Sequence, residues 1–457
     1  MDRDAIRALE RTYDGLLQEQ LPEVVSYVAE HAALFERHGI DPAEFRLPLR
    51  PMFYSRAELL RLEAGVRALW AGLLDVYAHV FSGDPDKAAA FLGTPTPFLP
   101  WLRKSLDRER CVDELFGRPD GFAWGNQLQL IEQNVTSGAG GMAGTEALAD
   151  FFDGFPALVG LRRHARVERL SLLDAYAGYF QREHGGHTVG YIDAFSPETG
   201  APSDTEGLLF VEGLRARGID LRHLTYPKAV FGVDGATLDG ARIDCFYRGE
   251  AAIALLEYLD SVTPYLDACD RGIARMVASL HEIVLFDKQL LPFLSDDEQN
   301  GFLSDERRAA IAAVLPWTRL LRDRATRFHG RAVRVPALCL ERQHDLVIKK
   351  GDGCCSNAVA IGAEHDADTW RRLVGQGIEA GNWVVQEMVV PPAESLPYLD
   401  GAALTRAEVV SMTCPYLVRG RVAAVGGRTS VPQGSRILVG AGAKGFQAGI
   451  RTAFCVE

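Results

Sequence analysis

The chain has 457 residues, of which 47% are hydrophobic and 24% charged, and its formal net charge at pH 7 is -12. This length accommodates two or three globular domains. The acidic balance argues against nucleic acid as a partner, because basic patches supply most of the affinity for a phosphate backbone. No apolar run approaches the ~20 residues that span a bilayer, and the first residues lack a hydrophobic signal core. We therefore expect a cytoplasmic protein that makes no membrane contact.

The positions of the cysteines and lysines further limit the kinds of functional site that the chain can form. The eight cysteines show no zinc-ligand spacing, since only Cys354 and Cys355 lie close together. The chain has only seven lysines, so a lysine in an otherwise apolar strand calls for a functional reason. Lys288, Lys349 and Lys350 lie in such apolar settings.

The first third of the chain is expected to be mainly helical. Residues 2–37 predict helices with charged faces, and Ser55 followed by Glu58 forms the pattern of a capping box. That pattern predicts a helix that continues to about Phe81. We expect residues 1–110 to be an N-terminal helical region that carries no evident chemistry.

A polar turn at residues 118–127 leads into an apolar strand. We expect a hairpin here, with Phe122 and Trp124 facing residues 128–131 on the partner strand. Arg118 is a candidate for contacting an anion in the adjacent site. The alternative is an arginine exposed on the turn.

The strand from Leu128 carries two oxygen-bearing side chains, Glu132 and Asn134. Residues two apart on a strand point to the same face, and Mg2+ prefers oxygen ligands of this kind. Glu132 and Asn134 therefore predict a metal site. The alternative is a buried strand that ends in a polar turn.

A glycine-rich turn over residues 137–141 follows the strand and precedes a predicted helix, residues 143–152. Its first residues, Ser137 and Gly138, begin a turn that can bring backbone N–H groups close to an anion. A metal site beside an anion cradle indicates nucleotide phosphates.

Residues 187–275 are expected to form a small α/β substrate domain. The pattern predicts a strand, a helix and a second strand, at residues 187–193, 205–217 and 220–225. Arg248 follows a third strand, where a guanidinium suits a substrate carboxylate; the alternative is a surface salt bridge.

The C-terminal part supplies further candidates for binding phosphate and adenine. Residues 345–350 form a buried strand whose Lys349 is well placed to meet phosphate as a point charge. A helix is expected at 306–324 and another at 366–380. The buried strand 382–392 carries Gln386 and Glu387, and a hairpin that turns at residues 419–420 delivers Arg428; a glycine-rich loop follows at residues 440–445.

Five of these segments, taken in order, resemble the ATP-grasp superfamily in its circularly permuted form, as in eukaryotic-type glutathione synthetase. They are the segments at 131–142, 286–294, 347–357, 384–391 and 426–430. In the usual ATP-grasp order the two lysines come first and the Glu-x-Asn metal site comes late, whereas here Glu-x-Asn comes first. The resemblance covers roughly residues 110–450. It implies an α/β ATP-grasp fold with a small Rossmann-like substrate domain and N-terminal helices.

The resemblance also implies roles for individual residues. Glu132 and Asn134 match the Mg2+ ligands, and Asp352 is the candidate for a further acidic ligand. The ATP-binding set comprises the phosphate lysines, the flap over the phosphates (residues 351–356), the adenine strand and the glycine turn: Lys288, Lys349, Gly351, Gly353, Gln386, Glu387, Ser137 and Gly138. Arg428 matches the arginine that binds the acceptor carboxylate and the acyl phosphate, and Arg248 and Arg118 fall where substrate is bound.

Two departures from glutathione synthetase argue against γ-glutamylcysteine and glycine as substrates. Cys354 and Cys355 replace glycines in the flap, and Ser430 stands where that enzyme has a lysine. We expect an ADP-forming carboxylate–amine ligase that uses ATP and Mg2+, with an amino acid or peptide-like acyl donor and an amine acceptor. A homodimer follows from the resemblance alone, and the arginine-rich, lysine-poor composition hints at specialised bacterial metabolism.

Two other function classes remain open at this stage. A small-molecule kinase would use the same ATP site without an amine acceptor, and a non-catalytic module would only bind nucleotide. The expected division of the chain is the N-terminal region, a first ATP-grasp part (111–186), the substrate domain (187–275) and a second ATP-grasp part (276–457).

Overall fold

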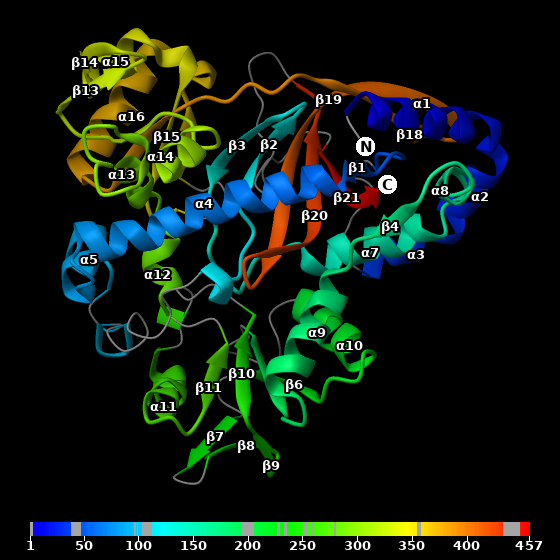
Figure 1. Ribbon diagram of the computed structural model, residues 1–457, viewed down its shortest axis with the longest axis horizontal. Helices are drawn as coiled ribbons and strands as arrows, with labels where there is room; N and C mark the ends of the chain where they lie inside the picture. The colour runs from blue at the N-terminus through cyan, green and yellow to red at the C-terminus, as the bar shows by residue number, and fades with distance from the viewer. Residues whose placement is uncertain are drawn as a thin grey trace.

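The computed structural model describes residues 3–37, 47–95, 97, 99–102, 112–193, 205–225, 229–232, 235–249, 255–256, 259–277, 280–353, 358–432 and 448–457. It is a mixed α/β structure with one large sheet and several smaller ones (Figure 1). Residues 354–356, half of the predicted flap, and all of the predicted glycine-rich loop at 440–445 lie outside the described residues. Within them, no helix is both long and apolar enough to cross a membrane.

The large sheet joins the beginning, middle and end of the chain. Its strands are, in spatial order, β1 (Met52–Ser55), β21 (Ala448–Val456), β20 (Arg421–Ser430), β19 (Ala403–Val418), β2 (Asp120–Trp124) and β3 (Gln127–Glu132), with β18 (Glu394–Asp400) beside β19 and β4 (Val167–Arg169) beside β21. Only the β1–β21 pair is parallel among these described strands. The two predicted hairpins, β2–β3 and β19–β20, are confirmed.

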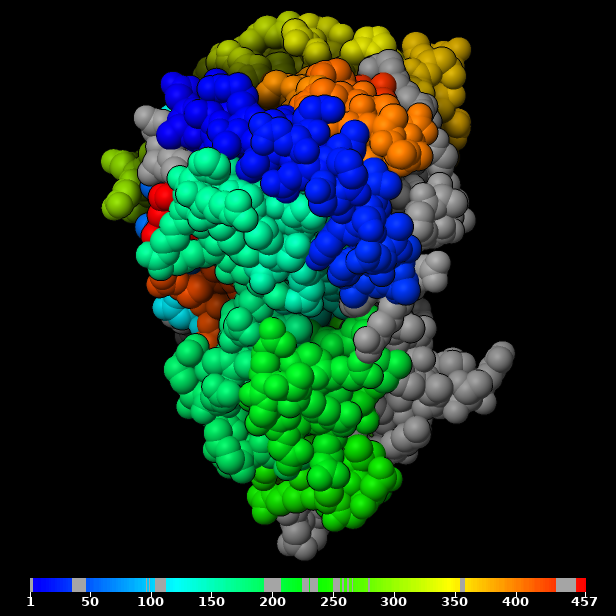
Figure 2. Space-filling view, turned by 90° about the vertical axis from the view of Figure 1, so that its right-hand side faces the viewer, coloured from blue at the N-terminus to red at the C-terminus, as the bar shows by residue number. Residues whose placement is uncertain are grey.

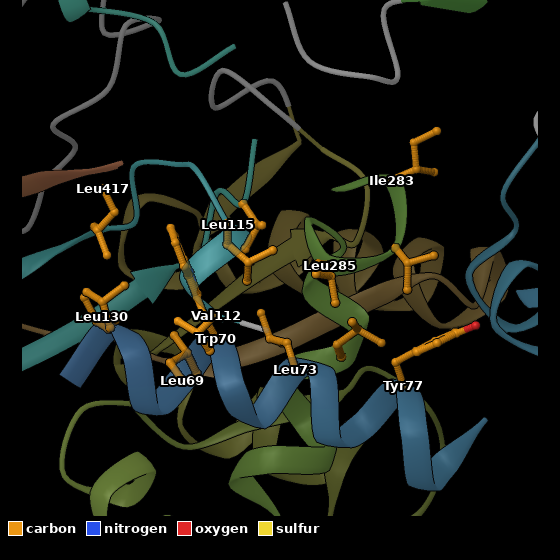
Figure 3. Close-up of a cluster of buried hydrophobic side chains, with 14 of the residues drawn as sticks. Leu69, Trp70, Leu73, Tyr77, Val112, Leu115, Leu130, Ile283, Leu285 and Leu417 are labelled. Carbon is orange, nitrogen blue, oxygen red and sulfur yellow. The ribbon is translucent and has the colours of Figure 1, made fainter. Parts of the chain in front are cut away.

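A 25-residue helix, α4 (Arg56–Val80), crosses the large sheet (Figure 1). It begins with the predicted capping box, because Ser55 and Glu58 each accept the other's backbone N–H. Its buried face carries Trp70 and Leu73 and packs against Leu130 of β3 and against Leu285 of α12 (Glu282–Leu285) (Figure 3). The helix therefore fixes β3 relative to the segment that leads to Lys288.

The helices before β1, together with α7 (Met142–Asp153) and α8 (Pro156–Leu161), cover the β1–β21 end of the sheet. Figure 2 shows the blue helices lying against the segment that follows the glycine turn. The helices of this part before β1 are α1 (Arg3–Glu19), α2 (Leu21–Glu30) and α3 (Ala32–Arg37). Helix α5 (Pro85–Leu92) lies at the other end of α4 (Figure 1).

A four-stranded parallel sheet lies at the bottom of Figure 1. Its order is β11 (Arg275–Val277), β10 (Cys245–Arg248), β5 (Val189–Asp193) and β6 (Leu221–Thr225). The predicted strand–helix–strand unit is confirmed, with α10 (Thr205–Arg215) between β5 and β6. Also in this part are α9 (Leu172–His184), α11 (Leu259–Asp270) and a small sheet of β7 (Ala229–Gly232), β8 (Gly235–Leu238) and β9 (Ala241–Ile243).

A four-stranded antiparallel sheet, at the upper left in Figure 1, carries Lys349 and Gln386. Its order is β12 (Thr318–Leu320), β17 (Trp383–Glu387), β15 (Leu346–Lys350) and β16 (Val359–Ile361). The predicted 306–324 helix is wrong beyond residue 312: α14 (Asp305–Ala312) ends before Pro316, and β12 pairs with β17 instead. Nearby elements are α13 (Leu291–Ser295), β13 (Ala325–Phe328), β14 (Arg331–Arg334), α15 (Val335–Glu341) and α16 (Ala367–Ala380), the last close to its predicted bounds.

Candidate active site

Glu132 and Lys288 meet at the junction of the large sheet and the α12 segment. Glu132 is the last residue of β3, and Lys288 begins the 3-10 helix η5 (Lys288–Leu290) instead of lying in a strand. Lys288 Nζ lies 2.7 Å from Glu132 Oε1 and donates to the Gly353 carbonyl at 2.6 Å. A candidate metal ligand and a candidate phosphate lysine, 156 positions apart in the sequence, are thus in direct contact.

Lys349 reaches the same place from β15. Its Nζ donates to the Ile131 carbonyl at 2.9 Å and to Gln386 Oε1 at 2.8 Å. Gln386 is oriented in turn by donating from Nε2 to Thr318 Oγ1 at 3.0 Å. Burial lowers the pKa of Lys349 to about 8; Glu132 opposes this shift and Lys288 adds to it. The Lys349 ammonium is therefore held in a buried site, where its charge is costly although Glu132 and Asp120 partly compensate it.

The predicted flap begins where β15 approaches η5. A Cβ on Gly351 would lie 2.5 Å from Asp287 Oδ1, so only glycine fits without movement. The Gly351 carbonyl accepts the Lys288 N–H at 3.0 Å, which ties the two lysine segments together. Asp352, the third predicted metal ligand, is half-exposed and pairs with Lys350 Nζ at 3.1 Å.

Asp120 belongs to the site, although the sequence analysis did not select it. It lies opposite Glu132 in the β2–β3 register and is only 6% exposed. Arg118 grips it with two nitrogens, at 3.0 and 3.1 Å, and Asn134 Nδ2 donates to it at 3.3 Å. Burial acts to raise the pKa of Asp120, but the nearby Arg118 and Arg428 hold it below its ordinary value.

Asp120 determines how two predicted residues are oriented. Asn134 lies beyond the end of β3 with a φ of +27°, so it does not continue the strand as its spacing suggested. Its amide nitrogen faces Asp120, so the amide oxygen is the atom of Asn134 that could bind a metal ion. Arg118 is mostly buried and also donates to the Gly140 carbonyl of the glycine turn, so it is not an arginine exposed on a turn.

Gln133, between the two predicted metal ligands, supports them from the opposite face. Its side chain is fully buried and donates to the Phe286 carbonyl at 2.7 Å, two residues before Lys288. Its own carbonyl accepts from Trp70 Nε1 of α4 at 3.1 Å. The first bond ties the Glu132 segment to the Lys288 segment, and the second ties it to α4.

The glycine turn contacts the parallel sheet through Ser137. Its backbone N–H donates to Glu282 Oε2 at 2.9 Å, and its hydroxyl accepts from Arg248 Nη2 at 3.3 Å. Arg248 is fully buried and lies 2.5 Å from Glu282 Oε1, so it is not part of a surface salt bridge. Gly138 donates its N–H to Thr136 Oγ1 at 3.2 Å within the turn itself.

The remaining candidates lie around these groups. Arg428 of β20 lies opposite Met412 of β19, on the sheet face from which its charge acts on Asp120. Two residues later Ser430 is buried, and its hydroxyl has no hydrogen-bond partner among the described residues. The Glu387 side chain pairs with His329 Nε2 at 2.9 Å.

Three groups in the site escaped the sequence analysis: Asp120, Gln133 and Glu282. Asp120 had a usable signal, because the expected hairpin places it close to Glu132 across the strand pair. Gln133 alternates with Glu132 and Asn134 and so had to face the core. Glu282 carried no signal, since its partners Arg248 and Ser137 are distant in the sequence.

Comparison with solved structures identifies the fold. A glutathione synthetase-like effector from Globodera pallida matches with a TM-score of 0.55 and 11% identity, over 96% of this chain and 97% of that one. A protein assigned as a γ-glutamylcysteine synthetase in Methylobacillus flagellatus matches with a TM-score of 0.40 and 11% identity, over 88% and 89%. The ATP-grasp ligase PsnB matches at 0.28 and 13%, over 54% and 87%.

No protein-family profile and no curated protein sequence matches the chain. The agreement with the first structure extends over nearly the full length of both chains. The chain therefore has the fold of a glutathione synthetase-like protein.

Proposed function

We propose that the protein is an ATP-dependent carboxylate–amine ligase that forms an amide bond and releases ADP and phosphate. The observation that carries this proposal is the convergence of Lys288 and Lys349 on the end of β3 beside Glu132. Phosphoryl transfer needs little from a protein besides positioning and neutralisation of charge. Two buried lysines, each tethered by hydrogen bonds, provide both.

The charges in the site fit a polyphosphate. Lys349 has a lowered pKa because it is buried; Lys288 adds to this shift, and Glu132 and Asp120 oppose it. Bound phosphate oxygens would add negative charge beside the lysine and raise its pKa. We assign Lys288 and Lys349 to the phosphates, Gln386 and Glu387 to the strand that contacts adenine, and Gly351 and Gly353 to the flap.

The oxygen donors also fit Mg2+, which favours carboxylate and amide ligands and keeps phosphate oxygens in its shell. Glu132 and Asn134 would hold the ion, with Asp352 as a further ligand after the loop moves inward. When bound, the ion would neutralise charge on the transferred phosphoryl group. Asp120 supports this assignment, since it directs the Asn134 oxygen away from itself.

In the proposed reaction, a donor carboxylate attacks the γ-phosphorus of ATP and becomes an acyl phosphate. An amine then attacks the carbonyl carbon, phosphate leaves, and an amide remains. Arg428 would stabilise the oxyanion that forms during this attack, a contribution of roughly 10²–10³ in rate. Ser137 and Gly138 of the glycine turn would belong to the ATP site, and Arg118 and Arg248 would lie at the substrate end.

The proposal includes the circularly permuted order of the ATP-grasp parts. In it, residues 111–186 and 276–457 build the ATP site, and residues 187–275 form a Rossmann-like substrate domain. The parallel β11-β10-β5-β6 sheet supports the last point, because its order reverses beside β5 as in doubly wound folds.

Two substitutions test the site. Lys349→Ala and Glu132→Ala should each abolish ADP release while the circular dichroism spectrum and cooperative unfolding are retained. Lys350→Ala, which removes a half-exposed neighbour, serves as the matched control and should keep activity. Turnover at the wild-type level in either site variant would contradict the assignment.

A further inference from the structure

A hollow lies on the large sheet, on the face opposite to Arg428. Ser411 and Thr413 of β19 line it, whereas Met412 between them points to the other face, where Arg428 of β20 lies beside it. Helix α1 and the first turns of α4 bound the hollow, at the end of the sheet where both helices meet β1 (Figure 1). The hollow is therefore separate from the proposed ATP site.

The hollow has the size of a small molecule. It gives the centres of water molecules about 80 Å³ of room. One water needs roughly 10–15 Å³ of such room, so about six waters, or the heavy atoms of a small amino acid, would fill it. Leu62 of α4 and Trp124 at the end of β2 give the hollow an apolar side. A small ligand with both polar and apolar parts therefore fits.

Carboxylates are in excess in one corner of the hollow. Arg3 of α1 lies 3.5 Å from Glu10 and 3.7 Å from Glu58, so two carboxylates share one guanidinium at distances longer than an N–H···O hydrogen bond. Glu58 Oε2 accepts from the backbone N–H and the hydroxyl of Ser55, at 2.8 and 3.1 Å, and its Oε1 is the atom nearest Arg3. The corner can therefore accept hydrogen bonds from an ammonium group.

A guanidinium without a carboxylate partner lies beside this corner. Arg61 follows Glu58 by one helical turn, so both side chains lie on the same side of α4, and both line the hollow. Within the described part of the chain, Arg61 forms no ion pair. The third arginine of the lining, Arg451, is occupied by Glu394 at 2.6 Å and by the Pro51 carbonyl at 3.2 Å. Arg61 is therefore the group that can bind a carboxylate.

We propose that this hollow is a binding site for a free amino acid with a small side chain, in its zwitterionic form. The α-carboxylate would pair with Arg61, the α-ammonium with Glu10 and Glu58, and the side chain would lie against Trp124. The lining carries three arginines and three glutamates, so a ligand of zero net charge with both signs complements it better than a simple anion or cation. The inference does not depend on the proposed ligase function.

The experiment measures calorimetric binding of alanine, lactate and alaninamide to the full chain at pH 7. The three probes have similar sizes, but lactate lacks the ammonium group and alaninamide lacks the carboxylate. The wild-type protein should bind alanine at least tenfold more tightly than either of the other two, because loss of a hydrogen bond to a charged group has an effect of about this size.

Variants on the two sides of the hollow test the two contacts separately. Arg61→Gln should weaken alanine binding at least tenfold and leave alaninamide binding unchanged. Glu10→Gln should weaken the binding of alanine and alaninamide but not that of lactate. Arg7→Gln is the matched control, since Arg7 is an exposed arginine of α1 that does not line the hollow, and it should bind all three probes as the wild type does. Either site variant decides the claim if the other does not fold.

Arg428→Gln locates the bound alanine. Arg428 belongs to the proposed active site, so this variant should bind alanine as the wild type does if the hollow is the site. Alanine binding that is lost in Arg428→Gln but kept in Arg61→Gln would place the amino acid in the active site and overturn the inference. Absence of alanine binding, or equal binding of the three probes, would also overturn it. None of these results depends on ADP release, so the ligase proposal is decided separately.

Discussion

Replacing Lys349 with methionine separates the stability cost of its buried charge from its contribution to ATP binding. The pKa of Lys349 falls from an ordinary 10.5 to about 8, and each pKa unit corresponds to about 1.4 kcal/mol. Keeping this lysine charged at pH 7 therefore costs the folded protein about 3 kcal/mol. Methionine removes that cost, but it leaves the Ile131 carbonyl and Gln386 Oε1 without their donor, at about 1 kcal/mol each.

We expect Lys349→Met to unfold in urea at pH 7 with a free energy about 1 kcal/mol above that of the wild type. A lowered lysine pKa destabilises the fold fully below pH 8, and the effect disappears as the pH rises from 8 towards 10.5. The stability advantage of Lys349→Met over the wild type should therefore shrink as the pH rises from 8 towards 10.5. Lys350→Met, at a half-exposed site, should change stability by less than about 0.5 kcal/mol.

The same substitution should weaken ATP binding. A hydrogen bond to a charged group contributes about 1.5–3 kcal/mol, so the dissociation constant of Mg-ATP should rise by about 10- to 100-fold. Calorimetric titration measures this change. A variant that loses 2 kcal/mol or more of stability, or one that binds ATP as the wild type does, would refute the reasoning for Lys349.

Four other predictions follow from the site. At pH 8, ATP binding should take up protons, because phosphate raises the pKa of Lys349 from about 8; calorimetry in two buffers with different ionisation enthalpies measures the uptake, and equal heats would contradict it. Gly351→Ala should weaken ATP binding and lower the free energy of unfolding by about 1–3 kcal/mol, because the added methyl group overpacks against Asp287. Wild-type values in both denaturation and ATP titration would contradict this. Asp120→Asn should destabilise the fold by about 3 kcal/mol because Arg118 is left uncompensated. Asp287→Asn should stabilise the fold at pH 7, since burial raises the pKa of Asp287 to about 6 and its charged form is therefore disfavoured. Chemical denaturation that finds Asp120→Asn more stable, and Asp287→Asn less stable, than the wild type would refute both predictions.

Glu132, Lys288 and Lys349, which lie together in the structure, could be selected from the sequence because each carried a local signal. Lysines are rare in this chain, so Lys288 and Lys349 in apolar segments stood out, and both lie beside Glu132. The two hairpins and the strand–helix–strand unit had apolar runs separated by turn residues. Their elements form close to the expected bounds.

Contacts between segments that lie far apart in the chain could not be predicted from local sequence patterns. Glu282 pairs with Arg248 and Ser137, which lie 34 and 145 positions away, and no periodicity links the three residues. The helix expected to continue beyond residue 312 was wrong because partners in β17, more than sixty residues later, draw residues 318–320 into a strand. Local propensity cannot represent such tertiary pairing.

The central claim is tested most directly by the products of the purified protein with Mg-ATP, a pool of amino acids and other small acids as donors, and a pool of amines. Mass spectrometry of the mixture and a coupled assay for ADP give the result. The proposed ligase predicts ADP release that requires both donor and amine, with a new product lighter than their sum by one water. ADP release that needs no amine and leaves a stable phosphorylated acid would contradict it and identify a kinase.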